Sequence, residues 1–272
     1  MLDTAIIGTG PAGLSAAINL KLHDKSVVWF GSARFSDKVE KSEKIANYPG
    51  MGYVSGAELN ARFADHAREL GLTVEDKMVT NIMPMGEHFM LLAENEVYEA
   101  KTVLLATGVV SARSFAGEAE LLGRGVSYCA TCDGMLYRGK NVAVLGYSDT
   151  ARREAEFLSG IGCSVTYFDR PKTCEISGRN LVESVTCDGE TVEAEGVFLL
   201  RPTMAPTDLF PGLAVENGYV SVDRKMDTNL PGLFAAGDCT GGPLQVSKAV
   251  GEGLIAGQSA AAYAAELLRK AK

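Results

Sequence analysis

The sequence has no apolar run that approaches the roughly 20 residues of a membrane-spanning helix, and it has no excess of positive charge. Its 26 Lys and Arg residues are outnumbered by 34 Asp and Glu residues, which gives a formal net charge of −8. This balance argues against nucleic acid or an anionic membrane as a partner. Because Met1 to Asp3 lead directly into an apolar segment, there is no room for a signal peptide, and we expect a cytoplasmic protein.

Histidine is scarce as well, because the chain has only three, and these form no pair. The cysteines form only one closely spaced pair. A structural zinc site needs four ligands, usually a second CxxC or two histidines, so we expect no metal. The remaining cysteines are spaced singly along the chain, and we expect them to be small core residues. They are Cys163, Cys174, Cys187 and Cys239.

The closely spaced pair is Cys129-Ala-Thr-Cys132, which is followed at once by Asp133. Two thiols at this spacing can close a small disulfide, and one of them commonly has a lowered pKa, so that a thiolate is available near neutrality. The adjacent carboxylate of Asp133 could move the proton that thiol–disulfide exchange requires. The motif therefore favours a redox-active disulfide.

A glycine turn stands near the start of the chain, between the apolar segment Thr4 to Ile7 and a predicted helix from Leu14 to Leu22. The turn reads Gly8-x-Gly10-x-x-Gly13, in the order strand, turn, helix that a dinucleotide fold requires. Gly8 permits the tight turn, Gly10 lets the backbone approach a pyrophosphate, and Gly13 lets the helix pack on the strand. The helix N-terminus offers N–H groups to the phosphates.

A second strand–turn–helix begins with Asn141 to Leu145 and Gly146, so we predict an α/β fold with two Rossmann-like units. The strand Val27 to Phe30 lacks the usual acidic residue at its end, which leaves Ser32 or the main chain to contact a ribose. We also expect a strand at Ser164 to Phe168, a small hairpin within 172–195 and a long Ala- and Gly-rich helix after Pro243.

Five motifs occur together in one order. They are Gly8-x-Gly10-x-x-Gly13, Ala46-Asn47-Tyr-Pro-Gly50, Ala106-Thr107-Gly108, Cys129-Ala-Thr-Cys132-Asp133 and Ala235-Ala-Gly237-Asp238. With these motifs the chain resembles the low-molecular-weight thioredoxin reductase family of flavoproteins over essentially its full length. The resemblance implies an FAD-binding domain built from residues 1–112 and 230–272. A smaller inserted domain, residues 113–229, would carry the CxxC motif on a degenerate NAD(P)-type fold.

The resemblance also assigns roles to residues. Cys132 would face the flavin, Cys129 would attack the disulfide of a thioredoxin, and Asp133 would act as the acid and base. The FAD-binding residues would be Gly8, Gly10, Pro11, Ala12 and Gly13 at the pyrophosphate. Asn47, Thr107 and Gly108 would lie on the flavin side, and Val79 at the adenine. Gly237 and Asp238 would lie at the ribitol, and Gln245 and Val246 near the isoalloxazine. Ser32 stays the candidate from the strand end for a ribose contact. A homodimer is expected from the family.

The second nucleotide turn departs from the family pattern. NADPH-using relatives have Gly-Gly-Gly-x-Ser-Ala, whereas this chain has Gly146-Tyr147-Ser148, so that side chains stand where a phosphate would need bare backbone. The following strand ends with Asp169 instead of an arginine cluster, and Arg201 begins the segment that replaces Gly-x-x-Pro-Asn-Thr. We therefore predict that the electron donor is reduced ferredoxin, as in the branch of the family that uses no pyridine nucleotide.

Three functions remain compatible with the sequence. The first is a ferredoxin-linked thioredoxin reductase, the second is an NADPH-dependent thioredoxin reductase with an altered pocket, and the third is a non-catalytic flavoprotein whose disulfide acts as a redox sensor. A second flavin in the degenerate pocket is a further possibility. Because ferredoxin is acidic, its docking would need a local basic patch. Residues that could form this patch are Arg138, Lys140, Arg152, Arg153 and Arg170.

Overall fold

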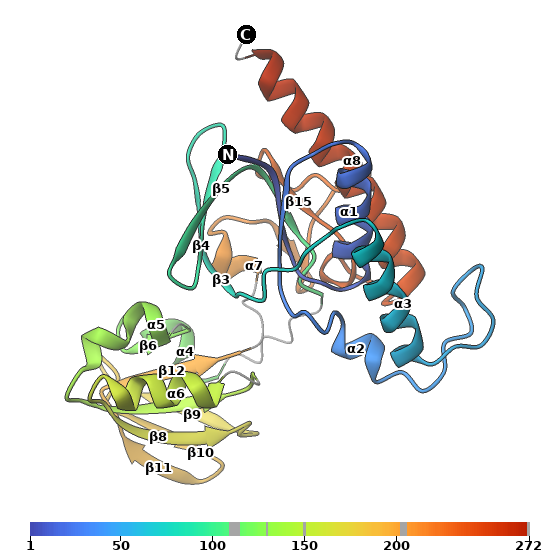
Figure 1. The fold of residues 1–272 in the computed structure, drawn as a ribbon. Coiled ribbons are helices and arrows are strands. Elements are labelled where there is room, and N and C mark those ends of the chain that lie inside the picture. Colours follow the sequence, from blue (N-terminus) through green and yellow to red (C-terminus); the bar gives the residue numbers. More distant parts are fainter. Residues whose placement is uncertain (109–114, 129, 149–150, 202–205, 271–272) are drawn as a thin grey trace. The chain divides into compact units, whose positions relative to one another are not determined.

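The computed structural model describes residues 1–108, 115–128, 130–148, 151–201 and 206–270. By packing, the chain divides into two compact units, which are described separately: residues 1–110 with 205–272, and residues 111–204 (Figure 1). None of the helices in the described ranges is long and apolar enough to cross a bilayer.

The first unit is built on a six-stranded sheet in the order β2-β1-β5-β4-β3, with β15 also paired to β5. Its strands are β1 (Leu2–Ile7), β2 (Val27–Phe30), β3 (Val79–Pro84), β4 (Phe89–Ala93), β5 (Glu96–Leu105) and β15 (Leu233–Ala235). β1, β2, β5 and β15 run parallel, whereas β3 and β4 form an antiparallel extension. β2, β15, the second half of β1 and the end of β5 are mostly apolar and buried, as expected of strands covered by helices.

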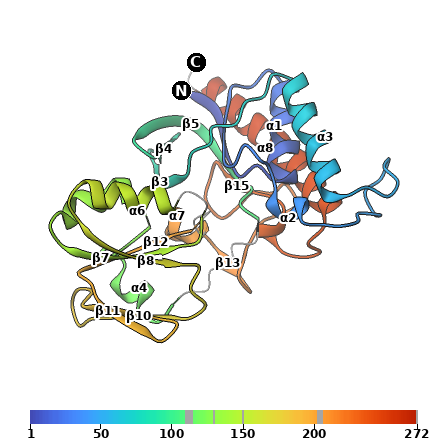
Figure 2. The same cartoon turned by 60° about the horizontal axis from the view of Figure 1, so that its bottom comes forward.

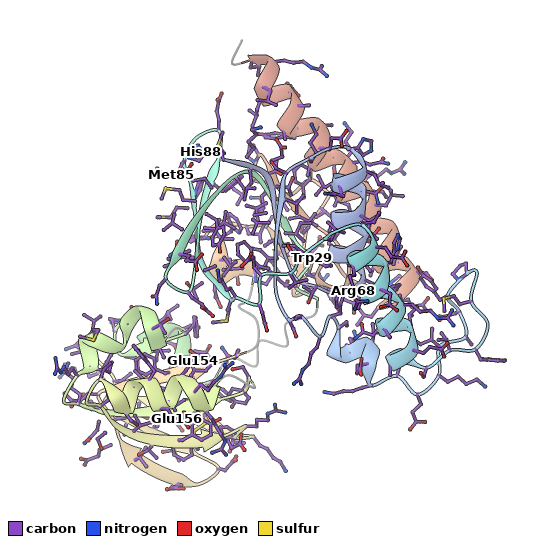
Figure 3. All side chains as sticks on the ribbon, viewed as in Figure 1. Trp29, Arg68, Met85, His88, Glu154 and Glu156 are labelled. Carbon is purple, nitrogen blue, oxygen red and sulfur yellow. A yellow bond between two sulfur atoms is a disulfide. The ribbon has the colours of Figure 1, made fainter. Side chains whose placement is uncertain are left out.

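Two helices, α1 (Pro11–Leu22) and α8 (Val246–Lys270), lie side by side against this sheet (Figures 1 and 2). Small residues allow the close approach: a Cβ at Gly253 would lie 2.2 Å from the carbonyl oxygen of Ala12, and one at Gly257 would lie 3.0 Å from that of Ala16. Gly253 and Gly257 of the predicted C-terminal helix therefore serve helix–helix packing, whereas a Cβ at Gly251 would enter open space. Trp29 is buried in the core of this unit and donates to the carbonyl of Gly8 at 2.9 Å (Figure 3).

The remaining elements of the first unit are short, apart from α3. They are α2 (Asp37–Glu40), α3 (Gly56–Glu69), α7 (Pro206–Leu209), β13 (Val215–Glu216), β14 (Tyr219–Val220) and η2, a 3-10 turn (Asp238–Thr240). Residues 205–229 thus lie in the first unit, although the sequence placed them in the inserted domain. The reason is apolar packing, because the Phe210 ring meets Phe89 of β4 at 5.9 Å and Met226 is buried in the core of the first unit.

The second unit contains a parallel sheet in the order β6-β12-β7-β8 and a separate antiparallel sheet in the order β11-β10-β9. The parallel strands are β6 (Val126–Ser127), β7 (Asn141–Gly146), β8 (Ser164–Asp169) and β12 (Gly196–Leu200), and the antiparallel strands are β9 (Cys174–Ser177), β10 (Ser184–Cys187) and β11 (Glu190–Glu193). Helical elements are α4 (Glu118–Leu121), α5 (Ala130–Asp133), the 3-10 turn η1 (Gly134–Tyr137) and α6 (Ala151–Gly160).

The predicted α/β fold with two Rossmann-like units is confirmed. The strands predicted at 4–7, 27–30, 141–145 and 164–168 all form. The first helix begins at Pro11, within the glycine motif and three residues before the predicted start at Leu14, and it ends at Leu22 as predicted. The segment 172–195 contains more structure than the small hairpin that the sequence predicts, since it forms the three-stranded sheet β9–β11.

Candidate functional site

In the first unit, the carboxyl ends of the parallel strands β1, β2, β5 and β15 meet at one edge of the sheet. Most of the predicted cofactor residues follow these ends directly, which is where open α/β sheets bind their ligands. Gly8 to Gly13 follow β1, Ser32 follows β2, Thr107 and Gly108 follow β5, and Gly237 and Asp238 follow β15.

The three glycines of the first turn meet different surroundings. Gly8 has a φ of +115°, and a Cβ there would lie 2.1 Å from the carbonyl oxygen of Ala106. A Cβ at Gly13 would lie 1.9 Å from the carbonyl oxygen of Gly8, so both positions require glycine for the fold itself. A Cβ at Gly10 would meet none of the described residues beyond its chain neighbours within 4 Å. Gly10 stands directly before Pro11 of α1, and the open space there fits a pyrophosphate at the helix N-terminus.

Thr107 provides a second sign of a ligand at this edge. Its Oγ1 atom is buried and has no hydrogen-bond partner within the described part of the chain. Buried polar atoms of proteins are nearly always paired, so an orphaned hydroxyl needs an explanation. The neighbouring Gly108 has a φ of +71° and open space where a Cβ would stand. The hydroxyl and the open space beside it fit a cofactor with polar atoms, such as the predicted FAD.

The turn after β15 is held by an ion pair that the sequence analysis missed. Lys248 and Glu252 of α8 lie 2.9 Å apart; the amine donates to the carbonyl of Gly237 at 2.6 Å, and the carboxylate accepts the Gly237 N–H at 2.8 Å. Asp238 forms an ion pair with Lys38 of α2 at 2.5 Å. The i,i+4 spacing of Lys248 and Glu252 was the only local signal, and it is typical of any solvated helix.

The other predicted cofactor residues are placed as follows. Asn47 is tied to the start of α8, because its carbonyl accepts the Ser247 hydroxyl at 3.1 Å, and this brings it near Gln245 and Val246. Val79 is buried in β3, four residues after Glu75. The carbonyl of Glu75 accepts the N–H of Gly31, the residue directly after β2. Ala12 of α1 faces α8 through its contact with Gly253.

In the second unit, the redox motif follows β6. Cys129 lies outside the described residues, and the position of the Cys132 side chain is not described either. Asp133 is half-buried and accepts a hydrogen bond from the Ser127 hydroxyl at 2.7 Å. Just beyond the motif, Met135 and Leu136 are 58% and 69% exposed, which gives the surface after Asp133 two apolar side chains.

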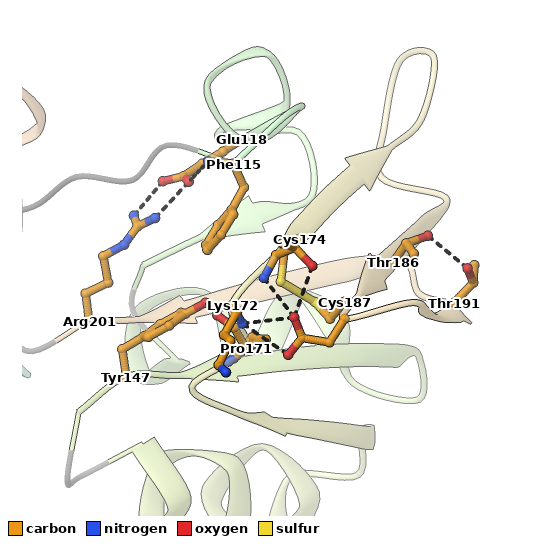
Figure 4. The surroundings of a disulfide bond; sticks show 12 residues. Phe115, Glu118, Tyr147, Pro171, Lys172, Cys174, Thr186, Cys187, Thr191 and Arg201 are labelled. Carbon is orange, nitrogen blue, oxygen red and sulfur yellow. Dashed lines mark hydrogen bonds and ion pairs between the residues drawn. A yellow bond between two sulfur atoms is a disulfide. The ribbon is translucent and has the colours of Figure 1, made fainter.

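The first residues of the second nucleotide turn are hydrogen-bonded to the end of the neighbouring strand β12. The N–H groups of Tyr147 and Ser148 both donate to the carbonyl of Leu200, at 2.9 and 3.0 Å. In a dinucleotide site the amides of this turn would face the phosphates. The Tyr147 ring stacks on Phe115 at 6.1 Å, and its hydroxyl donates to the carbonyl of Pro171 at 2.8 Å (Figure 4).

An ion pair between Arg201 and Glu118 lies at the same edge of the parallel sheet, at the end of β12. The Arg201 guanidinium donates to both carboxylate oxygens of Glu118, at 2.5 and 2.8 Å (Figure 4). It also lies over the rings of Phe115 and Tyr128. Burial alone would raise the pKa of Glu118, but the hydrogen bonds from Arg201 and the Phe115 N–H outweigh burial and hold this pKa below its usual value. The sequence did not indicate Glu118, because its partner is 83 residues away.

The five basic residues considered for a docking patch do not lie at one edge of the sheet. Arg138 and Lys140 precede β7, whereas Arg152, Arg153 and Arg170 lie beyond the carboxyl ends of β7 and β8. A six-residue strand separates these edges by roughly 17 Å. Arg152 is also paired with Asp169 at 3.4 Å. The patch predicted from the sequence is therefore not formed as one cluster.

Two cysteines are paired, contrary to the sequence expectation. Cys174 and Cys187 stand opposite each other on β9 and β10, with Cα atoms 4.3 Å apart, and form a disulfide (Figure 4). Cys163 and Cys239 are free and buried, as expected of small core residues. Burial raises the pKa of Cys239 to about 11, so this thiol is not a nucleophile near neutrality. No group of side chains suited to a metal ion occurs within the described ranges.

Replacing both Cys174 and Cys187 by alanine is expected to destabilise the antiparallel sheet by about 3 kcal/mol, the value for a disulfide that closes a short loop. Hydrogen exchange of the β9 and β10 amides measures this local free energy of opening. The matched control is Cys163→Ala, which removes a buried thiol of the same unit and should leave these amides unchanged. Equal exchange in the double variant and the wild-type chain would contradict the prediction.

Known proteins of one family resemble the whole chain. The family "Pyridine nucleotide-disulphide oxidoreductase" matches residues 2–175 and 169–253. Thioredoxin reductase of Helicobacter pylori is 34% identical over 307 residues, covering 97% of this chain and 99% of the relative. A ferredoxin-flavin thioredoxin reductase from Clostridium acetobutylicum has a structure with a TM-score of 0.90 and 41% identity, covering 99% of this chain and 98% of that chain. A thioredoxin reductase from Gloeobacter violaceus gives 0.81 and 30%, covering 97% and 95%.

Proposed function

Because the chain belongs to the pyridine nucleotide-disulphide oxidoreductase family, in the group of the thioredoxin reductases, we propose that it reduces the disulfide of a thioredoxin and takes its electrons from reduced ferredoxin. The chain is an FAD-dependent disulfide oxidoreductase. The observation that carries the choice of donor is the closed second turn, where the N–H groups of Tyr147 and Ser148 are bonded to Leu200.

FAD would be held at the ligand edge of the first unit. The pyrophosphate would lie against Gly10 and the N-terminus of α1, since a Cβ at Gly10 would enter open space. Thr107, with its orphaned buried hydroxyl, would donate to or accept from the flavin. Asp238 would bind a ribitol hydroxyl, with Lys38 neutralising its charge. Bound FAD supplies the electrons that reopen the Cys129–Cys132 disulfide.

The chain's own residues would carry out the exchange with thioredoxin. The Cys129 thiolate attacks one sulfur of the thioredoxin disulfide and forms a mixed disulfide, which releases the other thioredoxin sulfur as a thiolate. Cys132 then attacks the Cys129 sulfur, releases the second thioredoxin thiolate and restores the Cys129–Cys132 disulfide. Asp133, held by Ser127, supplies and accepts the proton. Exposed Met135 and Leu136 beside the motif offer apolar contact to a protein substrate.

The second unit supports a donor other than a pyridine nucleotide. A dinucleotide needs free backbone amides at the turn and cationic groups for its phosphates. Here the Tyr147 and Ser148 amides of the turn are bonded to Leu200, Arg201 is bonded to the buried Glu118, and Arg152 is paired with Asp169. The Clostridium acetobutylicum protein of similar fold is a ferredoxin-flavin thioredoxin reductase, and this similarity supports ferredoxin as the donor. The cytoplasmic location and the homodimer stay predictions.

The energetics permit this direction of electron flow. Plant-type ferredoxins have reduction potentials near about −400 mV, and thioredoxin has one near about −270 mV. A difference of about 130 mV over two electrons corresponds to about 6 kcal/mol in favour of thioredoxin reduction. Reduced ferredoxin is therefore a sufficient donor without a pyridine nucleotide.

Anaerobic mixing of the purified protein with each donor tests the proposal. Reduced ferredoxin is expected to bleach the flavin band, and NADPH is expected to leave it yellow or to act about 10²- to 10³-fold more slowly, the effect of two missing hydrogen bonds to charged phosphate. Stopped-flow absorbance at the flavin band measures both rates. Rapid bleaching by NADPH would favour the NADPH-dependent alternative. Bleaching without turnover of any thioredoxin would favour the redox sensor, and two flavins per chain would indicate a second cofactor.

A further inference from the structure

Four donors converge on one buried carboxylate close to the redox motif. Glu118 is only 3% exposed. It accepts two hydrogen bonds from Arg201, at 2.5 and 2.8 Å, one from the Tyr128 hydroxyl at 2.9 Å and one from the Phe115 N–H at 2.9 Å. Because hydrogen bonds to an ionised group are shorter and stronger than neutral ones, these contacts fix the Tyr128 side chain in place.

Tyr128 is the residue immediately before Cys129, and the strand β6 ends one residue earlier, at Ser127. The Tyr128 ring also lies under the Arg201 guanidinium, 5.9 Å from it. Asp133, on the other side of the motif, accepts a hydrogen bond from the Ser127 hydroxyl. The chain that enters the redox motif is therefore held by the ion pair at Tyr128 and by Asp133 at Ser127.

Stability alone does not explain this arrangement. Burial of a charged pair carries a large desolvation cost, and apolar side chains of similar size would stabilise the fold as well or better. The pair joins the end of β12 to α4 (Figure 4). Its carboxylate accepts the hydroxyl of Tyr128, the residue before the redox motif. It also occupies the edge at which a Rossmann-like unit would bind a nucleotide. A role in fixing the position of Tyr128 accounts for both the desolvation cost of the ion pair and its location beside the redox motif.

We propose that Glu118, Arg201 and Tyr128 are positioning residues for Cys129, and that the ion pair holds the Tyr128 hydroxyl and, with it, the backbone that leads into the redox motif. The proposal rests on the proposed function in one respect, namely that Cys129 is the thiol that attacks thioredoxin. A nucleophile that is displaced by a small distance reacts far more slowly, even when its chemistry is intact.

Tyr128→Phe tests the proposal, because it removes the hydroxyl and keeps the ring. We expect kcat/KM for thioredoxin to fall about tenfold, the effect of one lost hydrogen bond to a charged group, with the loss in kcat and not in KM. Flavin reduction by the donor should be unchanged, which a general loss of structure would not allow. The matched control is Glu120→Gln, which removes an exposed charge from the same helix and should have no effect.

Glu118→Gln gives the second measurement. If the two residues act through one network, the double variant with Tyr128→Phe should lose no more activity than Glu118→Gln alone. Additive losses, or an unchanged kcat in Tyr128→Phe, would overturn the proposal. If Glu118→Gln fails to fold, the kcat of Tyr128→Phe still tests the positioning role.

A third measurement does not depend on thioredoxin. In a Cys132→Ser background, Cys129 reacts with an aromatic disulfide reagent, and the rate is recorded against pH. Tyr128→Phe is expected to change this rate and shift its pH profile, whereas Glu120→Gln should not. An unchanged profile would overturn the positioning role. A changed profile in a protein that reduces no thioredoxin would uphold that role and contradict the proposed function instead.

Discussion

Replacing Cys132 by serine is expected to abolish thioredoxin reduction, with a loss of about 10³-fold or more, as for other residues that act as one catalytic unit. Without the Cys132 thiol the redox disulfide cannot form, and a mixed disulfide between Cys129 and thioredoxin cannot be resolved. Reduction of the flavin by the donor should persist, because that step does not use the cysteines. Steady-state turnover with thioredoxin and single-turnover absorbance at the flavin band measure the two steps separately.

The other cysteines provide the controls for this prediction. Cys129→Ser should also abolish turnover, since it removes the attacking thiolate. Cys163→Ser and Cys239→Ser should retain it, because both thiols are buried, and burial raises the pKa of each. If the variants of Cys129 and Cys132 both kept full turnover with thioredoxin, the exchange scheme would be wrong.

Gly10→Val is expected to remove FAD while leaving the fold intact. Gly10 has an extended backbone, with φ of −68° and ψ of −179°, which valine adopts readily, and the space around its Cβ position is open. The added methyl groups would stand where the pyrophosphate approaches the N-terminus of α1. Loss of two or three hydrogen bonds to the charged phosphates, about 4 kcal/mol, would weaken FAD binding about 10³-fold.

The ratio of flavin absorbance to protein absorbance, together with the circular dichroism spectrum, measures this effect. Gly160→Val is the matched control, because it makes the same substitution at another open glycine, at the end of α6 in the second unit. That variant should keep its flavin. Full flavin content in Gly10→Val would show that the pyrophosphate does not lie against this turn. An unfolded Gly10→Val protein would show that the space around Gly10 is needed by the fold.

Features encoded within a few neighbouring residues could be predicted. Gly8 and Gly13 are required by contacts of the first turn itself, since a Cβ at either would collide with a backbone carbonyl, and such local requirements leave a recognisable motif. The strands after each turn were found because short apolar runs between turns read as buried strands. Tyr147 departs from the family pattern in the sequence itself, although its stacking on Phe115 could not be foreseen.

Features that depend on pairs of distant residues could not be predicted. Nothing near Glu118 or Arg201 indicates their ion pair, because the fold brings them together across 83 residues. Cys174 and Cys187 were expected to be separate core residues, since their pairing depends on the register of β9 and β10. The supposed basic patch failed because the direction of β7 places Arg138 and Arg152 at opposite edges of the sheet.

The sequence by itself determined the two nucleotide-type units, the turn that fits FAD and the redox cysteines, because each is a short motif whose chemistry depends on adjacent residues. Only the tertiary structure decided that the second turn is closed by Leu200, that Arg201 is committed to Glu118 and that a second disulfide joins β9 to β10. Strand order and register set these contacts, and both depend on packing over the whole unit and not on any local run of residues.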